Sequence, residues 1–186
     1  MNIGILALQG SIIEHINAVK SLKHNPIKVK LPKHLENISA LIIPGGESTT
    51  IIKLMQEYNL DKAIVEKANK GMPIYGTCAG AILLAKNLTN SKIPTLNLLD
   101  ISITRNDYGR QIDSFETMLQ VKGFSKPFHA IFIRAPIIHS YNSNSEILAE
   151  FNNKPVMLRQ NNILITTFHP ELTNDLRIHK YFVDMV

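Results

Sequence analysis

The chain has 186 residues, 45% hydrophobic and 19% charged, a composition typical of one globular domain, and we expect a single domain over residues 1–186. It has no apolar run of the ~20 residues needed to cross a bilayer and no signal-peptide pattern at its start, so we expect no membrane association. The net charge of +5 comes from scattered lysines and arginines, which argues against a nucleic-acid-binding surface.

The first half of the chain alternates short apolar runs with amphipathic stretches. Continuous apolar runs predict strands at 3–8 and 40–43 and another opened by Pro73, and alternating apolar residues and lysines predict a half-buried strand at 27–31. Helical spacing of apolar residues predicts helices capped by Ser11 and by Ser48 or Thr49, and a further helix over 61–69. Buried strands separated by helices indicate a parallel sheet with helices on both faces.

The second half is mainly β-structure. Short strand-like runs occur at 100–105, 118–122, 130–134, 146–151, 156–159 and 163–168, and a helix is expected only over 172–186. No repeat or linker divides the chain. We therefore expect an α/β, flavodoxin-like three-layer sandwich with a mostly parallel central sheet and a β-rich extension.

Cys78 is the only cysteine, so there is no internal disulfide, and a free thiol favours a reducing compartment such as the cytoplasm. It follows the run opened by Pro73, lies between Gly76 and Gly80, and precedes a good helix former over 81–86. This setting is typical of a nucleophile elbow, in which glycines let the backbone bend and N–H groups at the helix start favour a thiolate and hold an oxyanion. The simpler alternative is a buried structural cysteine.

His169 and Glu171 are the candidates for a base and its partner. They follow the strand over 163–168, and two-residue spacing in extended backbone directs both side chains to the same side. His169 could then take the proton of Cys78 while Glu171 holds the opposite ring nitrogen. Considered alone, the pair is better explained as a polar strand end and an acidic helix start, and only its combination with Cys78 favours catalysis. We assign no catalytic role to the other histidines, including His15 and His179 on the first and last helices.

A third stretch, Pro44-Gly45-Gly46-Glu47-Ser48-Thr49, ends the strand over 40–43. Its simplest interpretation is a glycine turn into a capped helix. It can also supply an oxyanion N–H from Gly46 and a carboxylate, Glu47, for a substrate ammonium group. Because open parallel sheets bind ligands at the carboxyl ends of their strands, we expect Gly46, Cys78 and His169 to converge there.

Taken together, the stretches resemble the class I, or triad, glutamine amidotransferases. The motifs are Gly76-Thr77-Cys78-Ala79-Gly80, Pro44-Gly45-Gly46-Glu47-Ser48-Thr49-Thr50 and Phe168-His169-Pro170-Glu171-Leu172-Thr173. More narrowly, the chain is similar to the glutaminase subunits of glutamine-dependent pyridoxal 5'-phosphate synthases. That match rests on Leu8-Gln9-Gly10 with Glu14-His15, on the stretch from Arg105 to Gln111 followed by Asp113-Ser114-Phe115-Glu116, and on Phe132-Ile133-Arg134-Ala135-Pro136. The matches span residues 4 to 173.

The resemblance implies that Cys78, His169 and Glu171 form a triad that hydrolyses L-glutamine to L-glutamate and ammonia through a thioester. It implies glutamine contacts from Gly46, Glu47, Ser48, Arg105, Ile133 and Arg134, and an oxyanion hole made by the N–H groups of Gly46 and Ala79. It also implies a hetero-oligomer with a (β/α)8-barrel synthase subunit, one glutaminase per synthase subunit, that uses the ammonia to make pyridoxal 5'-phosphate.

Other interpretations stay open from the residues alone. The chain could be a glutaminase serving a different synthase, a cysteine hydrolase of the same fold, or a non-enzymatic domain whose glycine turn binds an anion. Without the resemblance, an exposed ion pair is the simpler explanation for the arginines. We expect no metal or other cofactor, because one cysteine and dispersed histidines have no zinc-type spacing.

Overall fold

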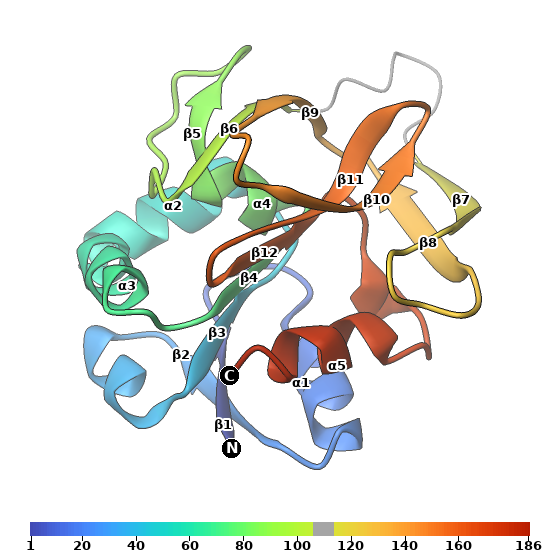
Figure 1. Cartoon of the computed structure of the whole chain (residues 1–186). Coiled ribbons are helices and arrows are strands. Elements are labelled where there is room, and N and C mark those ends of the chain that lie inside the picture. Colours follow the sequence, from blue (N-terminus) through green and yellow to red (C-terminus); the bar gives the residue numbers. More distant parts are fainter. Residues whose placement is uncertain (106–113) are drawn as a thin grey trace.

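The computed structural model describes residues 1–105 and 114–186 and is built on a seven-stranded sheet (Figure 1). The strand order is β10-β11-β12-β4-β3-β1-β2. Five strands from β12 to β2 run parallel, while β10 and β11 pair antiparallel at one edge. The strands are β1 Asn2–Leu6, β2 Asn25–Val29, β3 Ala40–Ile43, β4 Ile74–Thr77, β10 Glu146–Phe151, β11 Lys154–Gln160 and β12 Ile163–Thr166.

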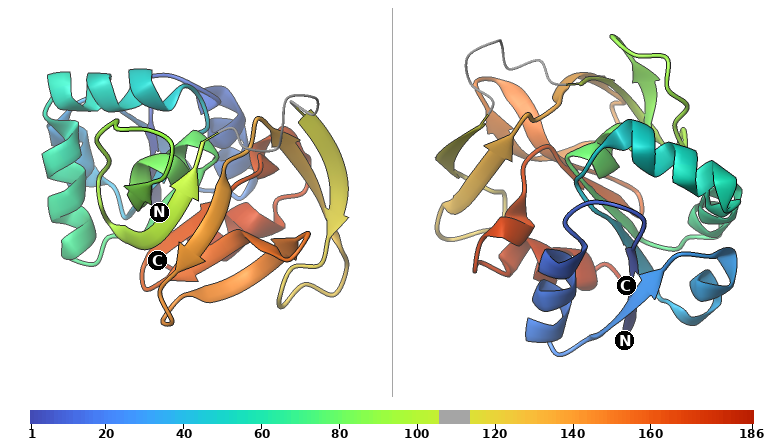
Figure 2. Two further views of the ribbon diagram at one scale, coloured as in Figure 1. Left: turned by 90° about the horizontal axis from the view of Figure 1, so that it is seen from above. Right: turned by 180° about the vertical axis from the view of Figure 1, so that it is seen from behind.

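Helices cover both faces of this sheet, as Figures 1 and 2 show. The helices α2 Ser48–Glu57, α3 Leu60–Asn69 and α4 Ala79–Leu84 pack on one face, and α1 Ile12–Ser21 and α5 Arg177–Val183 on the other. Side chains of a strand alternate between the faces, so Leu41 and Ile43 of β3 join the first core and Ala40 and Ile42 the second. The three-layer α/β architecture with a mostly parallel sheet is confirmed.

The β-rich extension is also present. The strands β5 Ala85–Leu88, β6 Leu99–Thr104 and β9 Ile137–Tyr141 form a small sheet, and β7 Ser114–Leu119 pairs with β8 Phe128–Ile133 in an antiparallel ribbon. The ribbon packs through stacked rings of Phe115 and Phe132, whose centroids are 4.5 Å apart. Short 3-10 helices, η1 Pro32–Asn37 and η2 Pro170–Leu172, complete the elements. Among the described residues, no helix combines the length and apolar character of a membrane span.

Several expected boundaries are wrong. The helix after Cys78 ends at Leu84, because Ala85 becomes extended and pairs with Leu99, so 85–86 belong to β5. The strand expected at 118–122 lies at Ser114–Leu119, and β5, β9 and η1 had no predicted counterpart. The last helix begins at Arg177 rather than at residue 172, after the 3-10 turn of η2. Glu47, not Ser48 or Thr49, caps α2, because its carboxylate accepts from the Thr49 N–H.

Candidate active site

Cys78 occupies a strained turn between β4 and α4. Its φ of +47° and ψ of −101° lie where non-glycine residues are rare, as at a nucleophile elbow. The turn is tight because Gly80 packs directly on β3, where any Cβ would collide with the carbonyl oxygen of Ile43. Because α4 has only six residues, the N–H groups of its first turn matter more here than a long helix dipole.

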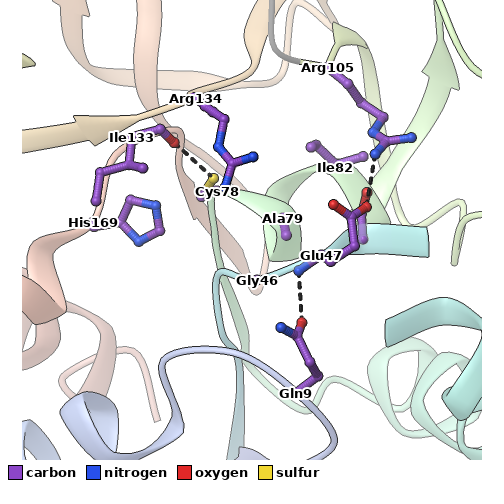
Figure 3. A pocket seen from close by; sticks show the side chains of 11 residues that line it. Gln9, Gly46, Glu47, Cys78, Ala79, Ile82, Arg105, Ile133, Arg134 and His169 are labelled. Atoms are coloured by element: carbon purple, nitrogen blue, oxygen red, sulfur yellow. Dashed lines mark hydrogen bonds and ion pairs between the residues drawn. The ribbon is translucent and has the colours of Figure 1, made fainter. Parts of the chain in front are cut away.

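His169 and Glu171 lie behind the sulfur of Cys78. His169 Nδ1 is 2.8 Å from Glu171 Oε1, and Figure 3 shows the imidazole beside the sulfur. Burial alone would lower the pKa of His169, but hydrogen bonds with Cys78 and Glu171 outweigh it and raise that pKa to about 10. Burial would raise the pKa of Glu171, yet the nearby His15 and His169, with the Ser11 hydroxyl, lower it to about 2. The pair therefore favours an imidazolium beside a carboxylate.

A pocket of about 250 Å³ opens in front of these residues (Figure 3). It brings together residues that the sequence singled out at or just beyond the carboxyl ends of β3, β4, β6, β8 and β12. Its lining consists of Gln9, Gly46, Glu47, Ser48, Cys78, Ala79, Ile82, Arg105, Ile133, Arg134 and His169. Of the predicted site residues only Glu171 does not line it, because its side chain is fully buried behind His169.

Glu47 and Arg105 form an ion pair at the rim of the pocket. Arg105 Nη2 is 3.0 Å from Glu47 Oε1, and the backbone of Arg105 is held on both sides by the amide of Asn90. A hydrogen bond from the Thr49 hydroxyl lowers the pKa of Glu47, and the charges of Arg105 and Arg134 add to this. The site thus holds both charge signs needed to bind an amino acid at its ammonium and carboxylate groups.

The segment after β8 closes the opposite wall. Arg134 has a φ of +43°, and Cys78 Sγ lies 3.9 Å from the carbonyl oxygen of Ile133. A positive φ at a residue with a long side chain is uncommon and marks a backbone shape imposed by its surroundings. The side chains of Ile133 and Arg134 are exposed towards the pocket, where they can contact a ligand.

Sequence reasoning gave no role in catalysis or glutamine binding to two polar residues of the site, Gln9 and His15, although both lie in stretches that carry the family resemblance. Gln9 lines the pocket, and its Oε1 accepts from the Glu47 N–H at 2.7 Å. His15 is fully buried, with Nε2 3.3 Å from Thr77 Oγ1, although we assigned it no role. A signal was present, since His15 lies at helical spacing with Ile12, Ile16 and Val19 on the apolar face of α1.

The expected stretch from Arg105 to Gln111 can be followed only at its first residue, because Asn106 to Gln111 lie outside the described residues. Within the described ranges, no cluster of three or more His, Cys, Asp or Glu side chains is arranged to hold a metal ion.

Comparison with known proteins gives consistent similarities over the whole chain. A model of the SNO glutamine amidotransferase family matches residues 5–186. The pyridoxal 5'-phosphate synthase subunit PdxT of Thermotoga neapolitana is 50% identical over 187 residues, covering 100% of both chains. PdxT of Fervidobacterium nodosum is 48% identical, covering 100% of this chain and 97% of its own.

Solved structures of glutamine amidotransferases superpose on this chain. A crystal structure of a glutamine amidotransferase superposes with a TM-score of 0.95 at 44% identity, covering 98% of this chain and 97% of the other. A glutamine amidotransferase from Thermotoga maritima superposes with a TM-score of 0.62 at 16% identity, covering 99% of this chain and 83% of the other, a likeness of fold alone.

Proposed function

The chain belongs to the SNO glutamine amidotransferase family, and we propose that it is the glutaminase subunit of a pyridoxal 5'-phosphate synthase, with residues 1–186 acting as one catalytic domain. It hydrolyses L-glutamine to L-glutamate and ammonia. The observation that supports this best is the pocket itself, which joins Cys78 and His169 to the Gly46 turn and to the Glu47–Arg105 pair.

In this proposal Cys78 and His169 react as a thiolate–imidazolium pair. Cys78 Sγ attacks the side-chain amide carbon of glutamine, and the carbonyl oxygen becomes an oxyanion held by the N–H groups of Gly46 and Ala79. His169 donates its proton to the departing nitrogen, so that ammonia leaves and a thioester remains. Glu171 accepts from His169 Nδ1 and keeps the other ring nitrogen directed at the reacting atoms.

The thioester is then hydrolysed by water. The neutral His169 removes a proton from the water as it attacks the thioester carbon, and the same oxyanion hole holds the second tetrahedral intermediate. Collapse of that intermediate breaks the C–S bond, releases glutamate and restores the Cys78 thiolate beside the His169 imidazolium.

Recognition of glutamine follows from the charges at the rim. Arg105, a guanidinium fork, pairs with the substrate α-carboxylate, and Glu47 pairs with its ammonium group. Ser48, Ile133 and Arg134 complete the glutamine contacts. Because Glu47 and Arg105 already pair with each other at 3.0 Å, substrate binding replaces or extends that contact.

The family implies a partner, and we propose a (β/α)8-barrel synthase subunit in a hetero-oligomer with one glutaminase per synthase subunit. Ammonia is mostly protonated and non-nucleophilic at neutral pH, so a direct transfer between the subunits protects it. The face around Gln9, Gly10, Gly46 and Cys78 is the proposed docking surface. A thiol nucleophile must stay reduced, which supports a cytoplasmic location.

The test is release of glutamate and ammonia from glutamine by the purified chain, alone and with a candidate barrel synthase. We expect hydrolysis to rise sharply with the synthase, to disappear in Cys78→Ala, and to persist in His129→Gln, an exposed histidine on the β7–β8 ribbon that serves as the control. Formation of pyridoxal 5'-phosphate by the complex identifies the pathway. Absence of hydrolysis with every synthase would leave a cysteine hydrolase with another substrate.

A further inference from the structure

Five residues behind the pocket form a closed ring of polar contacts, which we call the buried ring: Ser11, His15, Gly45, Thr77 and Glu171. Gly45 N–H donates to Thr77 Oγ1 at 2.8 Å, and Thr77 Oγ1 lies 3.3 Å from His15 Nε2. His15 Nε2 is 3.6 Å from Glu171 Oε1, which accepts from the Ser11 hydroxyl at 2.7 Å. Ser11 N–H donates to the Gly45 carbonyl oxygen at 3.1 Å and closes the ring.

The ring connects the two halves of the catalytic machinery. Glu171 orients His169, while Gly45 directly precedes the proposed oxyanion donor Gly46. The carbonyl and N–H of a trans peptide point in opposite directions, so the Ser11 bond to the Gly45 carbonyl turns the Gly46 N–H away from Ser11. Both peptide groups flanking Gly45 are therefore connected to the Glu171 carboxylate. The Gly45 carbonyl is connected through Ser11, and the Gly45 N–H through Thr77 and His15.

Of the ring's members only Glu171 has a role in the proposed reaction, and His15 is the one in direct contact with it that is also titratable. Its side chain is fully buried, a costly position for a polar ring unless its nitrogens are bonded. Its second nitrogen, Nδ1, lies 3.0 Å from Nε2 of His179 on α5, which is itself buried. Burial lowers the pKa of His15 despite the opposing charge of Glu171, and its two ring nitrogens contact Thr77 on one side and His179 on the other.

We propose that His15 is a positioning residue of glutamine hydrolysis, which holds the Glu171 carboxylate and, through Thr77, the Gly45 turn in their reactive arrangement. This inference rests on the proposed glutaminase function. His15 acts through two branches that can be measured separately. The Glu171 branch governs the reactivity of the Cys78–His169 pair, and the Thr77 branch governs the oxyanion hole, which matters only once a carbonyl is attacked.

The experiment compares two readouts in the complex with the synthase: steady-state hydrolysis of glutamine, and the rate at which iodoacetamide alkylates Cys78, which needs no oxyanion hole. Thr77→Val removes the acceptor of the Gly45 N–H at nearly constant shape. We expect it to lower kcat about tenfold, as for loss of one hydrogen bond, with KM and alkylation within about threefold of wild type. Thr77→Ser keeps the hydroxyl and should restore kcat.

His15→Leu interrupts both branches, so we expect it to lower kcat about 10- to 100-fold and to slow alkylation as well. Thr167→Val is the matched control, because Thr167 is equally buried and its hydroxyl has no hydrogen-bond partner among the described residues. It should leave both rates unchanged. If His15→Leu does not fold, the contrast between Thr77→Val and Thr77→Ser still decides the Thr77 branch.

Wild-type kcat and alkylation in both His15→Leu and Thr77→Val, with only the melting temperature lowered, would show that the ring serves packing and would overturn the proposal. A wild-type complex that does not hydrolyse glutamine would defeat the proposed function instead. In that case the dependence of Cys78 alkylation on His15 still supports the positioning role, and its absence refutes it.

Discussion

Part of the stability of this protein in mild acid should depend on the buried histidine His179. It lies in α5 with its side chain sealed from solvent, next to His15. Burial, followed by the proximity of His15, lowers the pKa of His179 to about 3 from an ordinary value of 6.5. Between about pH 3 and pH 6.5 the unfolded chain is therefore protonated at His179 while the folded protein is not. The contribution of His179 to the free energy of unfolding is fully present above pH 6.5 and is lost as the pH falls towards 3.

The size of the effect follows from proton linkage. A group of pKa 6.5 that titrates only in the unfolded state costs about 2 kcal/mol of unfolding free energy between pH 7 and pH 5, with a limiting slope of about 1.4 kcal/mol per pH unit. His179→Gln removes this titration and keeps a polar group facing His15. Between pH 7 and pH 5 we therefore expect the unfolding free energy of the wild type to fall by about 2 kcal/mol more than that of the variant.

The assay is urea unfolding at pH 7, 6 and 5, followed by far-UV circular dichroism because the chain has no tryptophan. His129→Gln, which replaces an exposed histidine, should retain the pH dependence of the wild type. A difference between wild type and His179→Gln that is the same at all three pH values would refute the reasoning, since it would mean that His179 titrates equally in the folded and unfolded chains.

Three further predictions concern the pocket. In Gly45→Ala, the new Cβ would lie 2.5 Å from His169 Cε1, so we expect glutamine hydrolysis to fall at least about 100-fold in a folded protein; a near-normal kcat would contradict this geometry. In Gly80→Ala, the Cβ would strike the backbone carbonyl of Ile43, and thermal melting should show a loss of about 3 kcal/mol or more. Arg105→Lys loses the planar fork, so KM for glutamine should rise about tenfold with kcat within threefold, and an unchanged KM would remove Arg105 from recognition.

The sharp turn at Cys78 could be predicted because its signal is local. Gly76 and Gly80 around Cys78 allow the backbone to turn sharply, and a strand before it and a helix after it can be recognised from neighbouring residues. The same holds for His169 and Glu171, whose spacing in extended backbone directs them to one side. The structure places all three together, with Glu171 2.8 Å from His169.

Other features had no local signal. The helix after Cys78 stops at Leu84 because Ala85 pairs with Leu99, a residue on another strand, and helix propensity is weaker than that pairing. The place of His15 on the apolar face of α1 indicates burial, but nothing near His15 or His179 in the sequence indicates that the two side chains meet. They acquire a role only because α1 and α5 pack side by side on the same face of the sheet and bring their rings to 3.0 Å.

The amino-acid sequence by itself determined the alternation of buried strands and helices, the turn that presents Cys78, and the residues of the proposed triad, because each depends on patterns within about ten residues. Only the tertiary structure decided how far α4 extends, which groups surround Glu171, and how Gly45 is joined to His15. These depend on contacts between residues up to 160 positions apart, such as Ser11 with Glu171, and burial sets their strength. Hydrogen bonds of this kind gain their importance from the exclusion of water, which only the packed fold provides.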